Sequence, residues 1–242
     1  MMKLNEFLDK LRLAESCKTL YIKGCFGAPM NAKNKKRYSG PTALAYNQRR
    51  AEMINAATPD TFGFDCVCLI KGILWGWNAD TSNVYGGAKY CSNGVPDVGA
   101  DGIVKYLQGV TTDFKNIIPG AVTHMPGHVG VYVGDGKVIE CTPKWTNDVQ
   151  YSNLGNIGYT TGHFRIWTNW GLLPWVDYSA TNADEKPVNE PNTDAEWYVV
   201  KKGDTATKIS IAFGISLAEF KRLNPQIKNI SLIYVGQKVR VR

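Results

Sequence analysis

The sequence of 242 residues predicts an α+β protein with two domains joined by a linker. In the larger part of the chain, helix-compatible segments come first and strand-like segments follow, which is typical of α+β folds. A stretch with two prolines and five acidic residues, 181–196, has no large apolar residue except Val188 and predicts an exposed linker. The expected boundaries are therefore a first domain at 1–180, the linker at 181–196 and a small domain at 197–242.

Three segments of the first domain have helical patterns. The stretch 1–17 interrupts its apolar residues with charged ones at helical spacing, which predicts a short amphipathic helix. The segment 39–56 has a proline near its expected start and a helix-compatible sequence after it. The apolar segment DCVCLIKGILWGW, 65–77, predicts a more buried helix, and the Gly- and Asn-containing stretch 78–102 predicts a long loop.

Strand patterns follow these helices. The segments AVTH, 121–124, and HVGVYVGDGKVIEC, 128–141, are rich in β-branched residues. The glycines on either side of Asp135 are typical of a tight turn, so 128–141 predicts a β-hairpin. The first domain is therefore expected to pack helices on an antiparallel sheet.

The hairpin pattern sets which side chains share a face. With a three-residue turn, Val133 faces Lys137 and Gly130 faces Glu140, so His128 lies diagonal to Glu140 on one face. The other face is then apolar and consists of Val129, Val131, Val133, Ile139 and Cys141. A two-residue turn would instead place the carboxylate of Glu140 among the valines, where its burial is expensive. The pattern therefore favours a register in which the carboxylate holds the imidazole.

A histidine backed by a carboxylate is the base and orienting group of many nucleophilic sites. Asp65 is a plausible N-cap, which places Cys66 at the first helical position, where the helix dipole favours a thiolate. Cys68 is rotated by about 200° and is expected to face the core. From position alone, Cys66 is either the nucleophile or one more buried core cysteine.

The C-terminal segment 197–242 predicts the order strand, helix, helix, strand. Asp204 stands where it would cap the first of these helices. This segment contains nine Lys or Arg and only two acidic residues, so it accounts for the whole net charge of +7. The positive charge would suit a polyanion, either nucleic acid or an anionic cell envelope.

Several classes of site and location are not expected. The sequence contains no phosphate-binding glycine loop, no apolar run long enough for a membrane span and no secretory signal segment at its start. Met125-Pro126-Gly127 separates His124 from His128 and prevents the helical spacing of zinc ligands. We therefore expect no metal, cofactor or membrane insertion, and binding of the basic segment to the cell envelope would explain its charge without a nucleic-acid partner. The six cysteines are expected to be free thiols in a protein made in a reducing cytoplasm.

Two motifs of the first domain resemble NlpC-type peptidases, which are papain-like cysteine peptidases acting on bacterial cell-wall peptides. FDCVCLIKGILW is similar to their nucleophile helix, and IPGAVTHMPGHVGVYVGDGKVIECTP to their histidine-bearing strands. The resemblance covers about 18–178 and implies that Cys66 is the nucleophile, His128 the general base and Glu140 the third polar residue. A His, Asn or Gln is more usual at that third place.

The segment LYIKGCFG, 20–27, resembles the tyrosine-bearing turn that precedes the nucleophile in this family. The resemblance implies that Tyr21 helps to bind the developing oxyanion. The alternative is that Tyr21 is a packed tyrosine without a chemical role.

The C-terminal segment resembles the LysM module throughout 197–242, in YVVKKGDT, LNP and YVGQKVRV. The resemblance implies binding of N-acetylglucosamine-containing glycans such as peptidoglycan. The implied groove residues are Gly203, Asp204, Thr205, Asn229 and Ile230. A purely structural role is the alternative for Gly203 and Asp204, because turn formation and helix capping would also account for these residues.

Together the two resemblances imply an endolysin-like peptidoglycan hydrolase that cleaves an amide bond of the stem peptide. Such a protein would accumulate in the host cytoplasm without a signal peptide and act on the cell wall. Cleavage at the N-acetylmuramoyl-L-alanine amide by the same residues is one alternative. A non-catalytic glycan-binding or cell-wall-binding protein is another, and the oligomeric state stays open.

Overall fold

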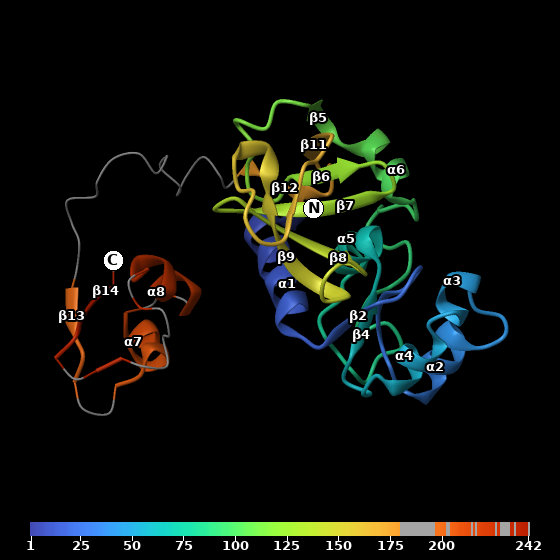
Figure 1. The fold of residues 1–242 in the computed structure, drawn as a ribbon, viewed down its shortest axis with the longest axis horizontal. Coiled ribbons are helices and arrows are strands. Elements are labelled where there is room, and N and C mark those ends of the chain that lie inside the picture. The colour runs from blue at the N-terminus through green and yellow to red at the C-terminus, as the bar shows by residue number, and fades with distance from the viewer. Residues whose placement is uncertain are drawn as a thin grey trace. The chain divides into compact units, whose positions relative to one another are not determined.

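The computed structural model describes residues 1–179, 197–201, 204–213, 215, 217–225, 227, 233–234 and 236–241. The chain divides into two compact units, Met1–Asp184 and Glu185–Arg242. Figure 1 shows both units. The predicted linker 181–196 lies outside the described residues.

The first unit has the predicted mixed α+β architecture. Its helices are α1 (Leu4–Ser16), α2 (Ala32–Ser39), α3 (Ala45–Gln48), α4 (Ala51–Ala56), α5 (Cys66–Leu74) and α6 (Ala100–Ile103), with 3₁₀ turns at Val104–Tyr106 and Gly155–Ile157. Its strands are β1 (Met2–Lys3), β2 (Thr19–Tyr21), β3 (Phe26–Pro29), β4 (Phe62–Phe64), β5 (Gln108–Thr111), β6 (Val122–Met125), β7 (His128–Gly134), β8 (Lys137–Thr142), β9 (Asp148–Leu154), β10 (Phe164–Arg165), β11 (Asn169–Leu172) and β12 (Val176–Asp177).

A seven-stranded sheet in the order β10-β9-β8-β7-β6-β11-β5 organises the first unit. All its pairings are antiparallel except the one between β10 and β9. The helices α1 and α5 pack on one face of this sheet (Figure 1). Helix α5 contacts β7 and β8, and helix α1 contacts β8 and β9. The apolar hairpin residues Val129, Val131, Ile139 and Cys141 belong to that core. Trp167 and Trp170 belong to a separate core that also includes Tyr132 and Val138 of the hairpin.

The hairpin of β7 and β8 contains a β-bulge that the sequence analysis did not predict. Gly134, and not Val133, pairs with Lys137, so the turn has two central residues rather than three. These are Asp135 and Gly136, both at positive φ, as a type I′ turn requires. Beyond the bulge the register is the predicted one, with the pairs Val131–Ile139 and Tyr132–Val138. The extra residue in β7 therefore keeps Glu140 off the valine face despite the shorter turn.

The segment 39–56 differs from its predicted single helix. Pro41 lies in a turn, and the helical part begins at Ala45 and is divided into α3 and α4 at Arg49 and Arg50. The preceding helix α2 and the small sheet β2-β4-β3 were also not predicted. Strands of three or four residues, buried on both faces, have too few positions for an alternating pattern to be recognised.

The close packing of α5 against β3 gives a first testable prediction. A Cβ atom on Gly72 would lie 2.6 Å from the backbone oxygen of Phe26, which cannot move as a side chain can. We expect Gly72→Ala to destabilise the first unit by about 1–3 kcal/mol, because overpacking outweighs the gain in helix propensity.

Urea unfolding followed by tryptophan fluorescence measures this effect, since six of the seven tryptophans lie in the first unit. Gly99→Ala is the matched control, because a Cβ there meets nothing within 4 Å. Equal stability of the two variants would contradict the packing.

The second unit has the predicted βααβ order. It contains β13 (Trp197–Val199), α7 (Ala206–Ala212), α8 (Leu217–Leu223) and β14 (Lys238–Arg240), and β13 pairs with β14 in antiparallel fashion. Its core consists of Val200, Ala206, Ile209, Phe220, Ile227, Val239 and Val241. The small domain therefore has a hydrophobic core of its own.

Candidate functional site

Cys66 is the first residue of α5, as the capping pattern predicted. The Asp65 carboxylate caps the helix by accepting a hydrogen bond from the Cys68 amide at 2.7 Å. Its second oxygen accepts one from the Gly24 amide, also at 2.7 Å. The helix start is therefore fixed to the loop after β2. Cys68 is buried in the core, as expected from the helical rotation.

The electrostatic prediction for Cys66 was wrong in its direction. Burial, followed by the nearby charge of Asp65, raises the pKa of the Cys66 thiol to about 12. Backbone N–H groups of Val129, Val67 and Cys66 itself act in the opposite direction, but the burial is larger. Desolvation of a nearly enclosed sulfur outweighs the helix dipole. At neutral pH the side chain of Cys66 is therefore a thiol rather than a thiolate.

The backbone amide of Val129 in strand β7 forms a hydrogen bond to the Cys66 sulfur. His128 is the residue directly before Val129 in the same strand. His128 Nε2 lies 2.6 Å from Glu140 Oε2, so the predicted pairing of imidazole and carboxylate is present. An ionised carboxylate can only accept, so Nε2 bears the proton and the lone pair of the neutral ring is on Nδ1. The ring also stacks on Trp167, with a centroid distance of 5.6 Å. Its orientation is therefore fixed from two directions.

Glu140 is fully buried and is surrounded by donors. Arg165 Nε donates to Glu140 Oε2 at 2.6 Å, and the Ser152 hydroxyl donates to Oε1. Burial raises the pKa of Glu140, but the hydrogen bond from His128, the charges of His128 and Arg165, and the bond from Ser152 together leave it lowered. The carboxylate is therefore ionised despite its burial.

Sequence reasoning missed Arg165. Its guanidinium lies 4.9 Å from the ring centroid of Trp145 and 5.9 Å from that of Trp167, and it also donates to Thr142 Oγ1 at 2.9 Å. The sequence pattern placed Glu140 off the apolar face and did not predict its burial, so it gave no reason to expect the permanent positive charge that a buried carboxylate needs. The local pattern around position 165 does not single out this arginine.

Tyr21 is the last residue of β2 and pairs with Phe64, two residues before Cys66. Burial, followed by the charge of Cys66, raises the pKa of its phenol. The ring contacts Tyr46 edge to face at 5.9 Å. Tyr21 therefore lies beside the candidate nucleophile, and it also has the packing contacts that its alternative interpretation requires.

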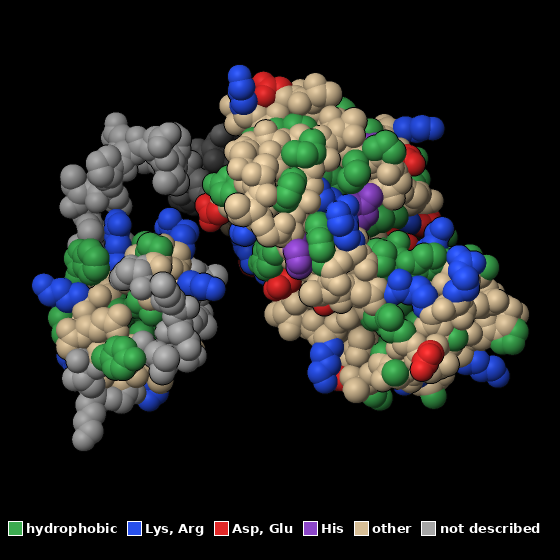
Figure 2. Space-filling view, viewed as in Figure 1, with side chains coloured by type: hydrophobic (Ala, Val, Ile, Leu, Met, Phe, Trp, Pro, Cys, Tyr) green, Lys and Arg blue, Asp and Glu red, His purple; other side chains and the backbone are tan. Residues whose placement is uncertain are grey.

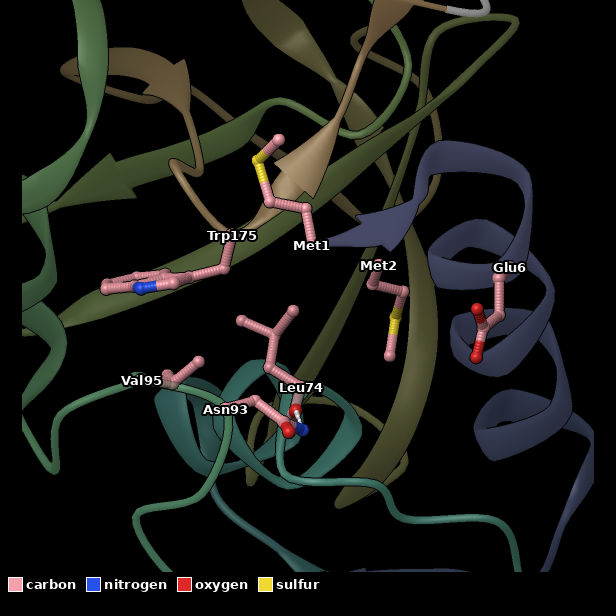
Figure 3. A pocket seen from close by; sticks show the side chains of 7 residues that line it. All are labelled: Met1, Met2, Glu6, Leu74, Asn93, Val95 and Trp175. Carbon is pink, nitrogen blue, oxygen red and sulfur yellow. Dashed lines mark hydrogen bonds between the residues drawn. The ribbon is translucent and has the colours of Figure 1, made fainter.

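Other features of the first unit lie apart from these residues. A pocket of about 320 Å³ is lined by Met1, Leu74 and Trp175 among others (Figure 3). It lies at the C-terminal end of α5, about 12 Å along the helix from Cys66. Within the described ranges, no group of three or more His, Cys, Asp or Glu is placed to hold a metal ion. No helix in those ranges is long and apolar enough to cross a membrane.

The predicted glycan-binding residues are described only in part. Gly203, Asn229 and Ile230 lie outside the described residues. Asp204 was expected to cap α7, but it accepts from the Lys201 amide and the Tyr198 hydroxyl, both at 2.8 Å. Thr205 takes the capping role, since its hydroxyl accepts from the Lys208 amide at 3.2 Å. Thr205 directly precedes the helix, which places its short side chain within reach of that amide.

Comparison with known proteins identifies the C-terminal unit. Residues 198–242 match the family model of the LysM domain, so the chain contains a LysM domain at its C-terminal end. An endolysin from Bacillus phage B103 is 31% identical over 111 residues, which covers 38% of this chain and 41% of the endolysin. A chlorophenol reductase from Desulfitobacterium hafniense is 41% identical over 46 residues, 19% of this chain and 14% of the reductase. The chain therefore spans less than half the length of either relative.

Proposed function

We propose that this protein is a peptidoglycan hydrolase whose first unit is an NlpC-type, papain-like cysteine peptidase. The observation on which this depends is the arrangement of three side chains. Cys66 begins a buried helix, and its sulfur lies against the backbone amide of Val129. His128, the residue before Val129, pairs with the buried carboxylate of Glu140. The partial similarity to a phage endolysin and the LysM domain support a peptidoglycan-associated role.

In the proposed reaction, His128 Nδ1 removes the proton of the Cys66 thiol as the sulfur attacks the carbonyl carbon of a stem-peptide amide. Backbone N–H groups at the start of α5 stabilise the oxyanion. The protonated imidazole then donates its proton to the leaving amine, and water hydrolyses the thioester. Glu140 orients the ring and stabilises the imidazolium. The raised pKa of Cys66 agrees with a base that acts during the attack.

The LysM domain would hold the enzyme on the wall. A single small module binds weakly, so its main effect is to raise the local concentration of the first unit at its substrate. In this proposal the protein accumulates in the host cytoplasm and reaches peptidoglycan at lysis. The glycan would contact Asp204 and Thr205 of the described residues.

Turbidity of purified peptidoglycan, followed by mass spectrometry of the released fragments, tests this function. New amine ends within the stem peptide are expected from a peptidase. Release of the whole peptide from the glycan would instead indicate the muramoyl-L-alanine amidase, and new reducing sugar ends would exclude both. Binding to the wall without any released fragment would favour the non-catalytic glycan-binding alternative.

Treatment with a thiol alkylator is expected to stop lysis by modifying Cys66. Cys91 is exposed and Cys17 is partly exposed, so both are changed to serine beforehand. The background variant must lyse walls as the parent protein does. Lysis that persists after complete alkylation of Cys66 would exclude a cysteine mechanism.

A further inference from the structure

Histidine and Lys or Arg side chains lie next to one another on the face of the first unit that Figure 2 shows. One histidine and one arginine meet at the buried carboxylate of Glu140. His128 Nε2 and Arg165 Nε each lie 2.6 Å from the same oxygen, Oε2, while the other oxygen accepts from the Ser152 hydroxyl. The two nitrogens can therefore be no further apart than twice this distance. An imidazolium at His128 would lie directly beside a permanent guanidinium charge.

Several contacts hold the guanidinium of Arg165 at this oxygen. It also donates to Thr142 Oγ1 at 2.9 Å, and it lies 4.9 Å from the ring centroid of Trp145 and 5.9 Å from that of Trp167. The Arg165 side chain is 12% exposed and the His128 side chain 14% exposed, so solvent screens the interaction between them only weakly. The charge of the arginine therefore acts on the histidine at short range and in nearly dry surroundings.

Charged and titratable groups reach the surroundings of His128 from several elements. They are Glu140 of β8, Arg165 of β10, Asp65 and Cys66 at the start of α5, Asp101 of α6 and His124 of β6. Asp101 accepts from the Gly127 amide at 2.7 Å and from His124 Nε2 at 2.9 Å, and Asp65 accepts from two backbone amides. Among the described residues, only the carboxylate in β8 forms a hydrogen bond with the His128 ring. Its charge and that of the arginine therefore act on the ring most directly.

We propose that Arg165 is a positioning residue that keeps His128 unprotonated in the resting enzyme, so that the imidazole is available as the base for Cys66. This inference rests on the proposed function and assigns a role in it to a further residue. A buried carboxylate alone favours the protonated imidazole, which has no lone pair to accept the thiol proton. The guanidinium shares the same carboxylate oxygen and repels a second positive charge there, which favours the neutral ring.

The dependence of peptidoglycan cleavage on pH tests this role. In Arg165→Met, the acid side of the rate profile should move to higher pH by about one unit or more. Cleavage that is lost at about pH 6 should therefore return at about pH 8, whereas a purely structural arginine would lower the rate by a similar factor at both. Arg165→Lys keeps the charge and should keep the acid side close to that of the parent protein. Lys144→Met is the matched control and should leave the acid side in place, because exposed Lys144 also contacts Trp145, at 4.7 Å, but forms no ion pair with Glu140.

Nitrogen NMR of the histidine rings in the unmodified full chain is a second measurement, and it applies even if Arg165→Met does not fold. At about pH 7 the His128 ring should bear one proton, on Nε2. The chain has three histidines, so the spectra of His124→Gln and His163→Gln identify the His128 signals. A His128 ring with protons on both nitrogens at this pH would overturn the inference, and so would an acid side that stays in place in Arg165→Met. Failure of the unmodified protein to cleave peptidoglycan would contradict the proposed function separately, since the NMR measurement needs no cleavage.

Discussion

A Cys66→Ala variant is expected to lose wall lysis by about 10³-fold or more while it still binds peptidoglycan. Without a sulfur, only substrate positioning and oxyanion stabilisation remain, and these do not replace a nucleophile. Wall binding should persist because the LysM domain is a separate unit with its own core. Initial rates of turbidity loss and sedimentation of the protein with walls measure the two properties on the same preparation.

Cys68→Ala is the matched control for this prediction. Both cysteines are nearly fully buried in α5, at 6% and 5% exposure, so the two variants remove the same group from similar surroundings. Cys68→Ala is expected to lower the free energy of unfolding by about 1 kcal/mol and to leave lysis close to that of the parent protein. Equal loss of lysis in both variants would indicate a folding defect. Full lysis by Cys66→Ala would exclude the proposed nucleophile.

The second large effect is expected at Glu140, where a substitution changes stability as well as chemistry. Glu140→Gln leaves Arg165 largely buried without its counter-charge, and removing one partner of a buried ion pair costs about 3–5 kcal/mol. Urea unfolding near neutral pH, followed by tryptophan fluorescence, measures this loss. Asp9→Asn is the control, because the ion pair of Asp9 with Arg12 is exposed and contributes at most about 1 kcal/mol.

A double substitution separates the ion pair from general disruption of the site. Glu140→Gln with Arg165→Met removes both charges, so it should recover part of the stability that Glu140→Gln loses. Strictly additive losses would show that Arg165 does not depend on Glu140. The double variant should still lyse walls poorly, because the imidazolium of His128 has no carboxylate to stabilise it.

The same pair predicts a dependence on pH. The folded pKa of Glu140 is lowered, so its stabilising effect is complete above its ordinary value of 4.5 and disappears as the pH falls through the lowered folded value. The stability difference between the parent protein and Glu140→Gln should therefore decrease in acid. Unfolding at about pH 7 and about pH 3 measures the difference. An undiminished difference at the lower pH would contradict an ionised Glu140.

The local features of the sequence predicted several parts of the molecule correctly. Asp65 indicated where α5 begins because a cap depends on residues only three positions apart. The alternation in 128–141 indicated that the valines form one face, because side chains in a strand alternate whatever surrounds them. The order of the βααβ unit was predicted for the same reason, since turn and helix signals lie within the elements they define.

Long-range packing decided what these local signals could not. The turn of the hairpin was predicted one residue too long, and only the bulge kept Glu140 in register. The helix start of Cys66 predicted a lower thiol pKa, but the depth of burial reversed it. Burial depends on the whole core rather than on the capping residue.

The sequence by itself determined which residues begin the central helix, which face of the hairpin is apolar and that a LysM domain ends the chain. Only the tertiary structure decided that Arg165 neutralises Glu140 and that Arg50 lies beside Tyr21. Capping and alternation act over a few residues, so the sequence contains them directly. Contacts between charges on distant strands and loops depend on strand order and register, which are fixed when the whole core packs.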